Sequence, residues 1–183
     1  MAEMSKEESA TRDIFLAVYP PPPANKFNGL RAHWVVWVPS ISSPDICKII
    51  HVVGSPFSGY GLEIKRNTNI KGLKACFHLA TIDGAHVTDD EPGEPSQDVK
   101  PTDDLEREAK KVEPPSVSKE PLNVNFVSTH RPCLLEALIG TDEMQGRRSQ
   151  DWTREYLERL ASRKIIPPES LKALDQAKAL ETQ

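Results

Sequence analysis

Five short apolar segments, each closed by turn-forming residues, occupy the first half of the chain and constrain its fold more than any other feature. Each has the length of a β-strand and is too short for a typical buried helix. Proline and glycine separate them, as in the run from Pro20 to Pro23 and the turn at Gly54. This close spacing predicts an antiparallel sheet. The predicted strands cover residues 13–19, 33–38, 47–53, 60–66 and 74–82.

Helical periodicity replaces strand patterning toward the C-terminus. Apolar residues recur at helical spacing in residues 150–161, and a second helix is predicted from Pro168 onward, with proline in its first turn. Residues 122–128 are interpreted as a last strand, and residues 134–139 as a short helix. Because strands come first and helices last, the expected class is α+β, with an antiparallel sheet of about five to six strands followed by C-terminal helices.

The length of 183 residues fits one domain, predicted at 13–183, after a polar leader at 1–12 that is expected to be disordered. From about residue 88 to residue 121 the chain is rich in proline and charged residues and almost without large apolar ones. Such a composition predicts a flexible acidic insertion. Within it, residues 103–112 have an acidic start and a basic end, which favours a short helix.

Charge and cysteine content argue against several classes of protein. The net charge of −4 disfavours a nucleic acid partner. No apolar run is long enough to predict a membrane span, and the polar N-terminus does not resemble a secretory signal, so a cytoplasmic location is expected. Cys47, Cys76 and Cys133 match no zinc or disulfide pattern, which favours reduced thiols. No metal or cofactor is predicted, since no matching motif is present.

Two histidines and a glutamate on predicted strands are the first candidates for chemistry. His33 begins a strand, and strand alternation puts it on the same face as Val35 and Trp37; taken alone, a structural role is favoured over that of a base. His51 lies between aliphatic residues and needs a hydrogen-bond partner if buried, so it is either a core residue or the orienter of another imidazole. Glu63 is a second candidate orienter, and otherwise an exposed carboxylate.

Ser149 lies at the start of the predicted helix, in the stretch RRSQDW. Serine is a preferred N-cap and Asp151 also suits the first turn, so capping is the favoured interpretation on propensity. The alternative is a nucleophile position, because the free N–H groups and positive dipole end of a helix start can hold an oxyanion. Arg147 and Arg148 are interpreted as either solvated surface or an anion-binding pair.

A resemblance to known proteins joins these residues. The stretches IFLAVYP, HWVVWV, HVVGSPFSGYGLEIKRN and SQDWTREYLERL resemble a group of small, mostly uncharacterised fungal proteins that have cysteine at the position of Ser149. An early His-Trp strand followed by a helix-start motif is also similar to the circularly permuted papain-like fold of PPPDE-type isopeptidases, lecithin retinol acyltransferase-like enzymes and permuted NlpC-type peptidases. This similarity implies that His33 is the base, that Ser149 occupies the nucleophile position, and that His51, or else Glu63, orients the base.

The same resemblance implies a hydrolase or acyltransferase with a small-molecule, peptide or acyl substrate. Serine is a poorer nucleophile than a thiolate, which leaves three explanations: a natural active serine, a natural inactive serine, or an engineered replacement of cysteine. Two further hypotheses stay open. One is a non-catalytic binding or interaction protein on the same fold, and the other is a small-molecule biosynthetic enzyme that uses acid–base chemistry without a covalent intermediate.

Overall fold

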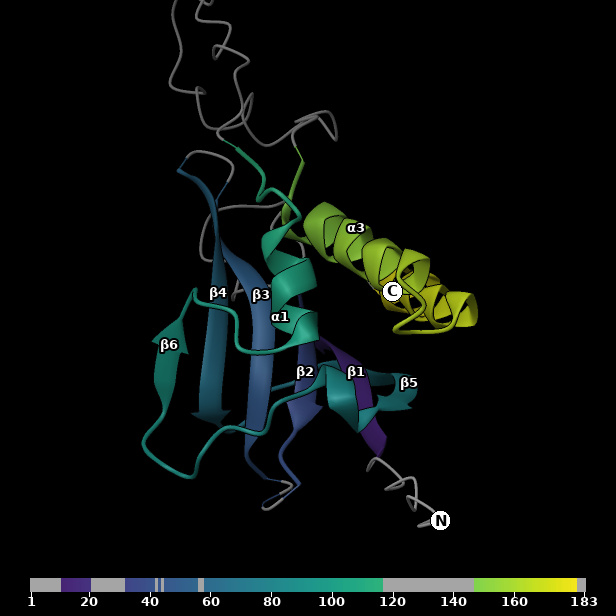
Figure 1. The fold of residues 1–183 in the computed structure, drawn as a ribbon. Coiled ribbons are helices and arrows are strands. Elements are labelled where there is room, and N and C mark those ends of the chain that lie inside the picture. Colours follow the sequence, from purple (N-terminus) through teal and green to yellow (C-terminus); the bar gives the residue numbers. More distant parts are fainter. Residues whose placement is uncertain are drawn as a thin grey trace, which may run out of the picture.

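A six-stranded antiparallel sheet forms the centre of the structure, a computed structural model that describes residues 11–20, 32–41, 43, 45–55, 58–116 and 147–180 (Figure 1). The strand order is β5-β1-β2-β3-β4-β6. The described residues add three α-helices to the sheet, which confirms the α+β class. The strands are β1 (Thr11–Tyr19), β2 (His33–Pro39), β3 (Cys47–Ser55), β4 (Gly59–Thr68), β5 (Ala75–Asp83) and β6 (Ser96–Asp98). The helices are α1 (Asp104–Lys110), α3 (Ser149–Ser162) and α4 (Lys172–Ala179), with short 3₁₀ turns η1 (Gly84–His86) and η2 (Pro168–Leu171).

The five strands predicted from the sequence correspond to β1 to β5, with ends that differ by one or two residues. Alternation along each strand divides its side chains between two faces. On β2, for example, Trp34, Val36 and Val38 belong to the main core, whereas Val35 belongs to a smaller cluster on the other side. Both clusters are apolar, and for this reason the strands read as continuous hydrophobic runs.

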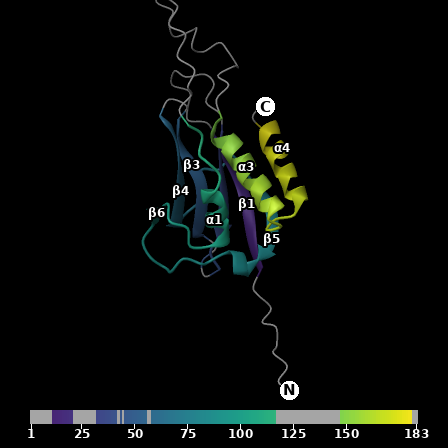
Figure 2. The same ribbon diagram turned by 45° about the horizontal axis from the view of Figure 1, so that its top comes forward.

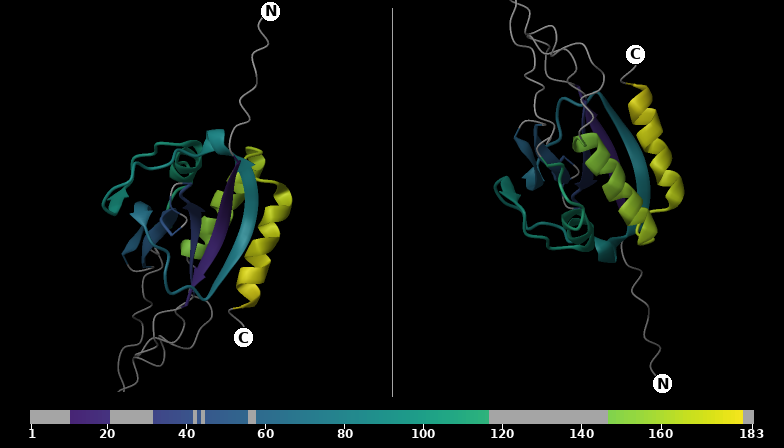
Figure 3. Two further views of the ribbon diagram at one scale, coloured as in Figure 1. Left: turned by 90° about the horizontal axis from the view of Figure 1, so that it is seen from below. Right: turned by 90° about the horizontal axis from the view of Figure 1, so that it is seen from above.

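One side of the sheet, which we call the helix face, is covered by the helices. Figure 2 shows α1 and α3 over this face and α4 beside α3. Trp152 and Tyr156 of α3 are fully buried against it. Burying a large aromatic or aliphatic side chain contributes roughly 2–3 kcal/mol, so α3 is a principal source of stability. The end-on views of Figure 3 show α4 next to β5. In the preceding turn η2, Ser170 Oγ donates a hydrogen bond to the Leu79 carbonyl of β5 at 2.6 Å.

The acidic segment is not a flexible insertion over the residues that the structure describes. Residues 88–116 run along the sheet and form β6 and α1, so the predicted short helix is present and the sixth strand lies here. The sequence prediction was wrong because the segment is held by buried ion pairs, which a count of apolar residues overlooks. Asp103 caps α1 by accepting from the Glu106 backbone N–H, and it also pairs with Lys48 at 2.6 Å.

The opposite side of the sheet, the second face, is bounded by a small cluster to which no described helical residue belongs. Its buried members are Ala17, Val35, Cys47 and Ile49. The chain between β4 and β5 must pass over three strands to reach the far edge of the sheet. Ile70 and Leu73 of that connection pack against the cluster, so residues 69–74 cover part of the second face.

Several sequence predictions fall outside the described residues. These are the leader over residues 1–10, the strand at 122–128, the short helix at 134–139 and Cys133. β1 begins at Thr11, inside the range assigned to the leader. None of the helices that the structure describes has the length and apolar character needed to cross a membrane.

Candidate functional site

A series of hydrogen bonds, which we call the histidine chain, joins His33, His51 and Glu63 across three neighbouring strands on the second face. His33 Nε2 lies 2.7 Å from His51 Nδ1, and His51 Nε2 lies 2.9 Å from Glu63 Oε1. His51 and Glu63 are buried, with 5% and 6% of their surface exposed, whereas His33, the last member of the histidine chain, is partly exposed. The structure therefore brings together three of the residues singled out in the sequence.

Strand register explains how they meet. His51 lies directly opposite Glu63 in the β3–β4 pairing. The β2–β3 register, extended from the pair of Val36 and Ile50, makes His33 and His51 diagonal neighbours on one face. A diagonal separation suits two imidazole rings, whose centroids lie 5.0 Å apart. The alternation expected for His33 and His51 is thus sufficient to line them up.

The hydrogen-bonding capacities of these groups decide which atom donates in each bond of the histidine chain. An ionised carboxylate only accepts, so His51 Nε2 must carry the proton that bonds Glu63. In a neutral His51 the other nitrogen, Nδ1, is then an acceptor, and His33 Nε2 must donate to it. A neutral His33 is left with a free lone pair on Nδ1. His33 Nδ1, at the end of the histidine chain, is consequently a proton-accepting nitrogen.

Burial sets the charge state of the site. Burial, together with nearby His51 and Lys65, lowers the pKa of His33 to about 4, against an opposing influence from Glu63. Burial also lowers the pKa of His51, although its bond to Glu63 counteracts this. Burial by itself would raise the pKa of Glu63, but bonds from Lys65 and His51 outweigh it and the pKa is lowered. At neutral pH the arrangement is one carboxylate and two neutral imidazoles.

Ser149 is the first residue of α3 rather than its N-cap, so the predicted capping role passes to its neighbour. Arg148 is the N-cap, and its backbone N–H donates to the Asp151 carboxylate at 2.7 Å. Gln150 Nε2 donates to the Ala32 carbonyl at 2.7 Å. Since Ala32 precedes His33, this bond brings the start of α3 to the end of the sheet where β2 begins.

Ser149 and His33 nevertheless belong to different layers. α3 packs on the helix face, whereas His33 projects from the second face. Among the described residues, no hydrogen bond joins Ser149 to either histidine. Arg147 is also engaged, since it pairs with Glu155 and donates to the Glu113 carbonyl at 3.2 Å.

Comparison with known proteins identifies a family but no activity. A family of unknown function (DUF6540) matches residues 12–167. The chain belongs to the DUF6540 family. No curated protein matches it, and no solved structure matches it. The matched region of this DUF6540 member contains α3 and all the described strands except the first residue of β1, and therefore His33, His51 and Glu63 as well as Ser149.

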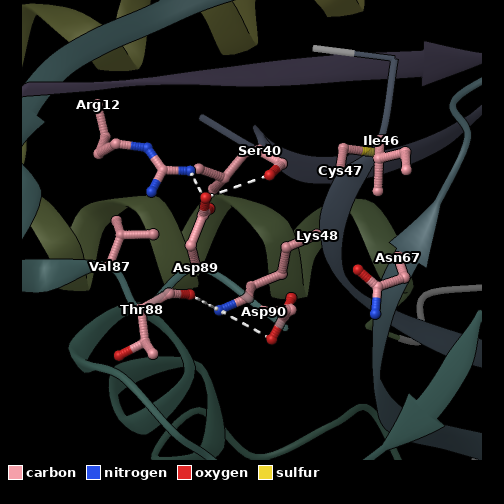
Figure 4. A pocket seen from close by; sticks show the side chains of 11 residues that line it. Arg12, Ser40, Ile46, Cys47, Lys48, Asn67, Val87, Thr88, Asp89 and Asp90 are labelled. Atoms are coloured by element: carbon pink, nitrogen blue, oxygen red, sulfur yellow. Dashed lines mark hydrogen bonds and ion pairs between the residues drawn. The ribbon is translucent and has the colours of Figure 1, made fainter. Parts of the chain in front are cut away.

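A second polar region of this DUF6540 member lies on the helix face and serves its architecture. A hollow of about 10 Å³, bordered by Arg12 and Lys48, has room for about one water molecule. Figure 4 shows both cations pointing at acidic partners. Arg12 pairs with Asp89 at 2.9 Å, and Lys48 with Asp103 at 2.6 Å. With its charges paired inside the protein, this hollow offers little to a ligand.

Two residues of the site were missed in the sequence. Gln97 of β6 donates from Nε2 to Glu63 Oε2, and Lys65 Nζ lies 3.1 Å from Glu63 Oε1. Lys65 follows Glu63 by two residues on the same strand face, so strand alternation alone was sufficient to find it. Gln97 gave no such signal, because its strand of three residues lies in a segment that reads as linker.

Proposed function

We propose that this chain is an enzyme in which His33 acts as general base and acid, His51 orients it, and Glu63 anchors the pair. The observation that carries the proposal is the continuous chain from a buried carboxylate to a partly exposed imidazole, with bonds of 2.9 and 2.7 Å. A base held in one tautomer by a second group, itself held by a third, is the arrangement that catalytic triads use.

The chemistry follows from where protons can go. His33 Nδ1 takes the proton of an attacking hydroxyl, thiol or water. The imidazolium that forms keeps its Nε2–H on His51, whose own N–H points at Glu63, so the negative charge of Glu63 stabilises the new positive charge. Because the pKa of His33 is lowered to about 4, the ring is unprotonated at neutral pH and has a lone pair for the incoming proton. The proton returns to the leaving group later in the cycle.

Hydrolysis or acyl transfer on a small-molecule, peptide or acyl substrate is the reaction class we propose first, on a permuted papain-like arrangement with Ser149 at the nucleophile position. Two facts support it: the histidine strand precedes the helix-start residue in the sequence, and the bond from Gln150 to Ala32 holds α3 at the start of β2. A cytoplasmic location belongs to this proposal and is consistent with the free thiols of Cys47 and Cys76.

Replacing Ser149 by cysteine tests the pairing directly. Ser149→Cys is treated with iodoacetamide across pH, with and without His33→Gln, in a background where the other cysteines are changed to serine. A thiol activated by His33 reacts well below its ordinary pKa of about 8.5 and loses that reactivity when His33 is replaced. A thiol that titrates near 8.5 in both proteins would end the assignment of residue 149 as nucleophile.

The placement of His33 and α3 on different faces favours a second candidate, acid–base catalysis without a covalent intermediate. Here His33 acts on a bound small molecule from the second face and residue 149 plays no part. The two candidates differ in one measurement on a simple activated ester. Acid–base catalysis predicts that Ser149→Ala keeps its rate while His33→Gln loses it. Equal rates in all three proteins, each indistinguishable from buffer, would instead indicate a non-catalytic binding protein.

A further inference from the structure

Gln97, on the edge strand β6, lies beside the carboxylate that ends the histidine chain. β6 pairs with β4 so that Gln97 lies opposite Lys65, on the strand face that also carries Glu63. Its side-chain amide donates to Glu63 Oε2. Gln97 itself is exposed, whereas the carboxylate it covers belongs to a residue that is only 6% exposed. The amide therefore stands between the buried carboxylate and solvent.

The two oxygens of Glu63 have different partners. Oε1 accepts from His51 Nε2 at 2.9 Å and lies 3.1 Å from Lys65 Nζ. Oε2 accepts from Gln97, the one partner that the described residues provide for it. A carboxylate held at one oxygen alone can turn about its terminal torsion, which is broad and roughly two-fold. Donation at Oε2 removes that freedom and keeps Oε1 facing His51.

We propose that Gln97 is a positioning residue: by donating to Glu63 Oε2 it holds Oε1 on His51 Nε2, and it thereby fixes the tautomers that leave His33 Nδ1 as the proton-accepting atom. This inference rests on the proposed function for its meaning, but not for its test. Among the described residues, Gln97 makes no hydrogen bond to either histidine, so we expect its influence to pass through the orientation and charge of Glu63.

Other contacts hold β6 where Gln97 can reach. Arg66 of β4 donates to the Lys100 carbonyl just after β6, at 3.1 Å. Asp98 accepts from the backbone N–H groups of the next two residues, at 2.5 and 2.6 Å, which turns the chain away after Gln97. A strand of three residues is otherwise marginal, and these anchors compensate for its length.

Histidine ring spectra of the intact ¹⁵N-labelled protein test the proposal without a substrate. In the wild type, His51 and His33 should each show a protonated Nε2 at neutral pH. Gln97→Leu keeps the size of the side chain and removes the donor. Glu63 Oε1 is then no longer held on His51 Nε2. Because the bond from Glu63 counteracts the lowering of the His51 pKa, its weakening should lower the titration midpoint of the histidine pair by roughly 0.5 pH units or more. The pair should also lose its single tautomer.

Gln97→Glu keeps the shape and adds a second carboxyl beside Glu63, whose negative charge should raise the midpoint, opposite to the change in Gln97→Leu. Ser96→Ala is the matched control on the same short strand, with its side chain on the opposite face, and should leave the spectra unchanged. Tyr19 and Lys65, which also face the pair, are kept constant. Wild-type spectra in Gln97→Leu, or equal shifts in Ser96→Ala, would overturn the role of Gln97. Failure of the thiol test at residue 149 leaves these readouts unaffected, which separates this inference from the proposed function.

Discussion

Arg66 of β4 and Glu106 of α1 are joined by two hydrogen bonds, at 2.5 and 2.8 Å, across the boundary between sheet and helix. Lys48 Nζ lies 2.9 Å from the same carboxylate, and Glu106 has no exposed surface. Burial by itself would raise the pKa of Glu106, but bonds from Arg66 and Lys48 outweigh it and lower the pKa to about 2. This cluster holds the acidic segment against the helix face.

Glu106→Gln should destabilise the protein strongly. The substitution keeps the shape but leaves the charges of Lys48 and Arg66 buried without their shared counter-ion. Removing one partner from a buried ionic cluster costs about 3–5 kcal/mol. Urea unfolding measures the loss as a lower midpoint. Glu94→Gln, an exposed change in the same segment, is the control and should stay within about 0.5 kcal/mol of wild type. Equal midpoints for the two variants would show that the cluster contributes nothing.

Stability should fall as the pH drops from 6.5 toward 4. In the unfolded chain His33 takes up a proton near its ordinary pKa of 6.5, whereas in the folded protein its pKa is lowered to about 4. The unfolded state therefore binds more protons in this window, and folding loses up to about 3 kcal/mol as the pH falls through it. Unfolding measured between pH 7 and 5.5, where carboxylates of ordinary pKa stay ionised, checks the first part of this loss. His33→Gln should flatten the dependence, and an unchanged slope would contradict the assignment.

Gly54→Ala should damage the β3–β4 hairpin. Gly54 has a φ of +139°, and a Cβ there would lie 2.1 Å from the Gly59 carbonyl oxygen. Backbone strain and steric overlap act together, so a loss of about 2 kcal/mol or more is expected. Gly61→Ala is a matched control on the facing strand, since nothing lies within 4 Å of its added Cβ. Thermal unfolding of both variants compares them, and the prediction fails if Gly61→Ala is the more damaging.

Tyr156→Phe should weaken the attachment of α1 to α3. The Tyr156 hydroxyl donates to the Leu105 carbonyl at 3.0 Å in a fully buried position. Its removal leaves a buried carbonyl without this donor, at a cost of about 1–3 kcal/mol. Tyr19→Phe is the comparison, because Tyr19 is only half-buried and its hydroxyl has no described hydrogen bond. Chemical unfolding should separate the two by at least about 1 kcal/mol.

Much of the fold was predictable, because it depends on local signals. β1 to β5 are apolar runs bounded by proline and glycine, and such runs indicate strands whatever lies around them. α3 shows its buried stripe directly in Trp152, Tyr156, Leu157 and Leu160. β6 was missed because its identity comes from pairing with β4 and from ion pairs formed at a distance. Composition reports how much apolar surface a segment offers, not which charges it will meet.

The candidate site shows the same division. Alternation predicted the faces of His33 and His51, and antiparallel register then brings them to Glu63. The N-cap of α3 was harder to predict, since Ser149 and Asp151 were both plausible caps. In the structure the Arg148 backbone N–H bonds to the Asp151 carboxylate instead. Ser149 and His33 lie in different layers because α3 packs on the helix face. Residues far apart in the sequence determine on which face α3 packs.

The acidic segment spans the edge of the sheet, with Gln97 on the second face and Glu106 on the helix face. Because one stretch of chain makes both contacts, neither is expected to release independently. In native-state hydrogen exchange, the amides of α1 and those that pair β6 with β4 should open as a single cooperative unit. The bond from Gln97 to the histidine chain would then be lost whenever the ionic cluster on the other side of the sheet opens.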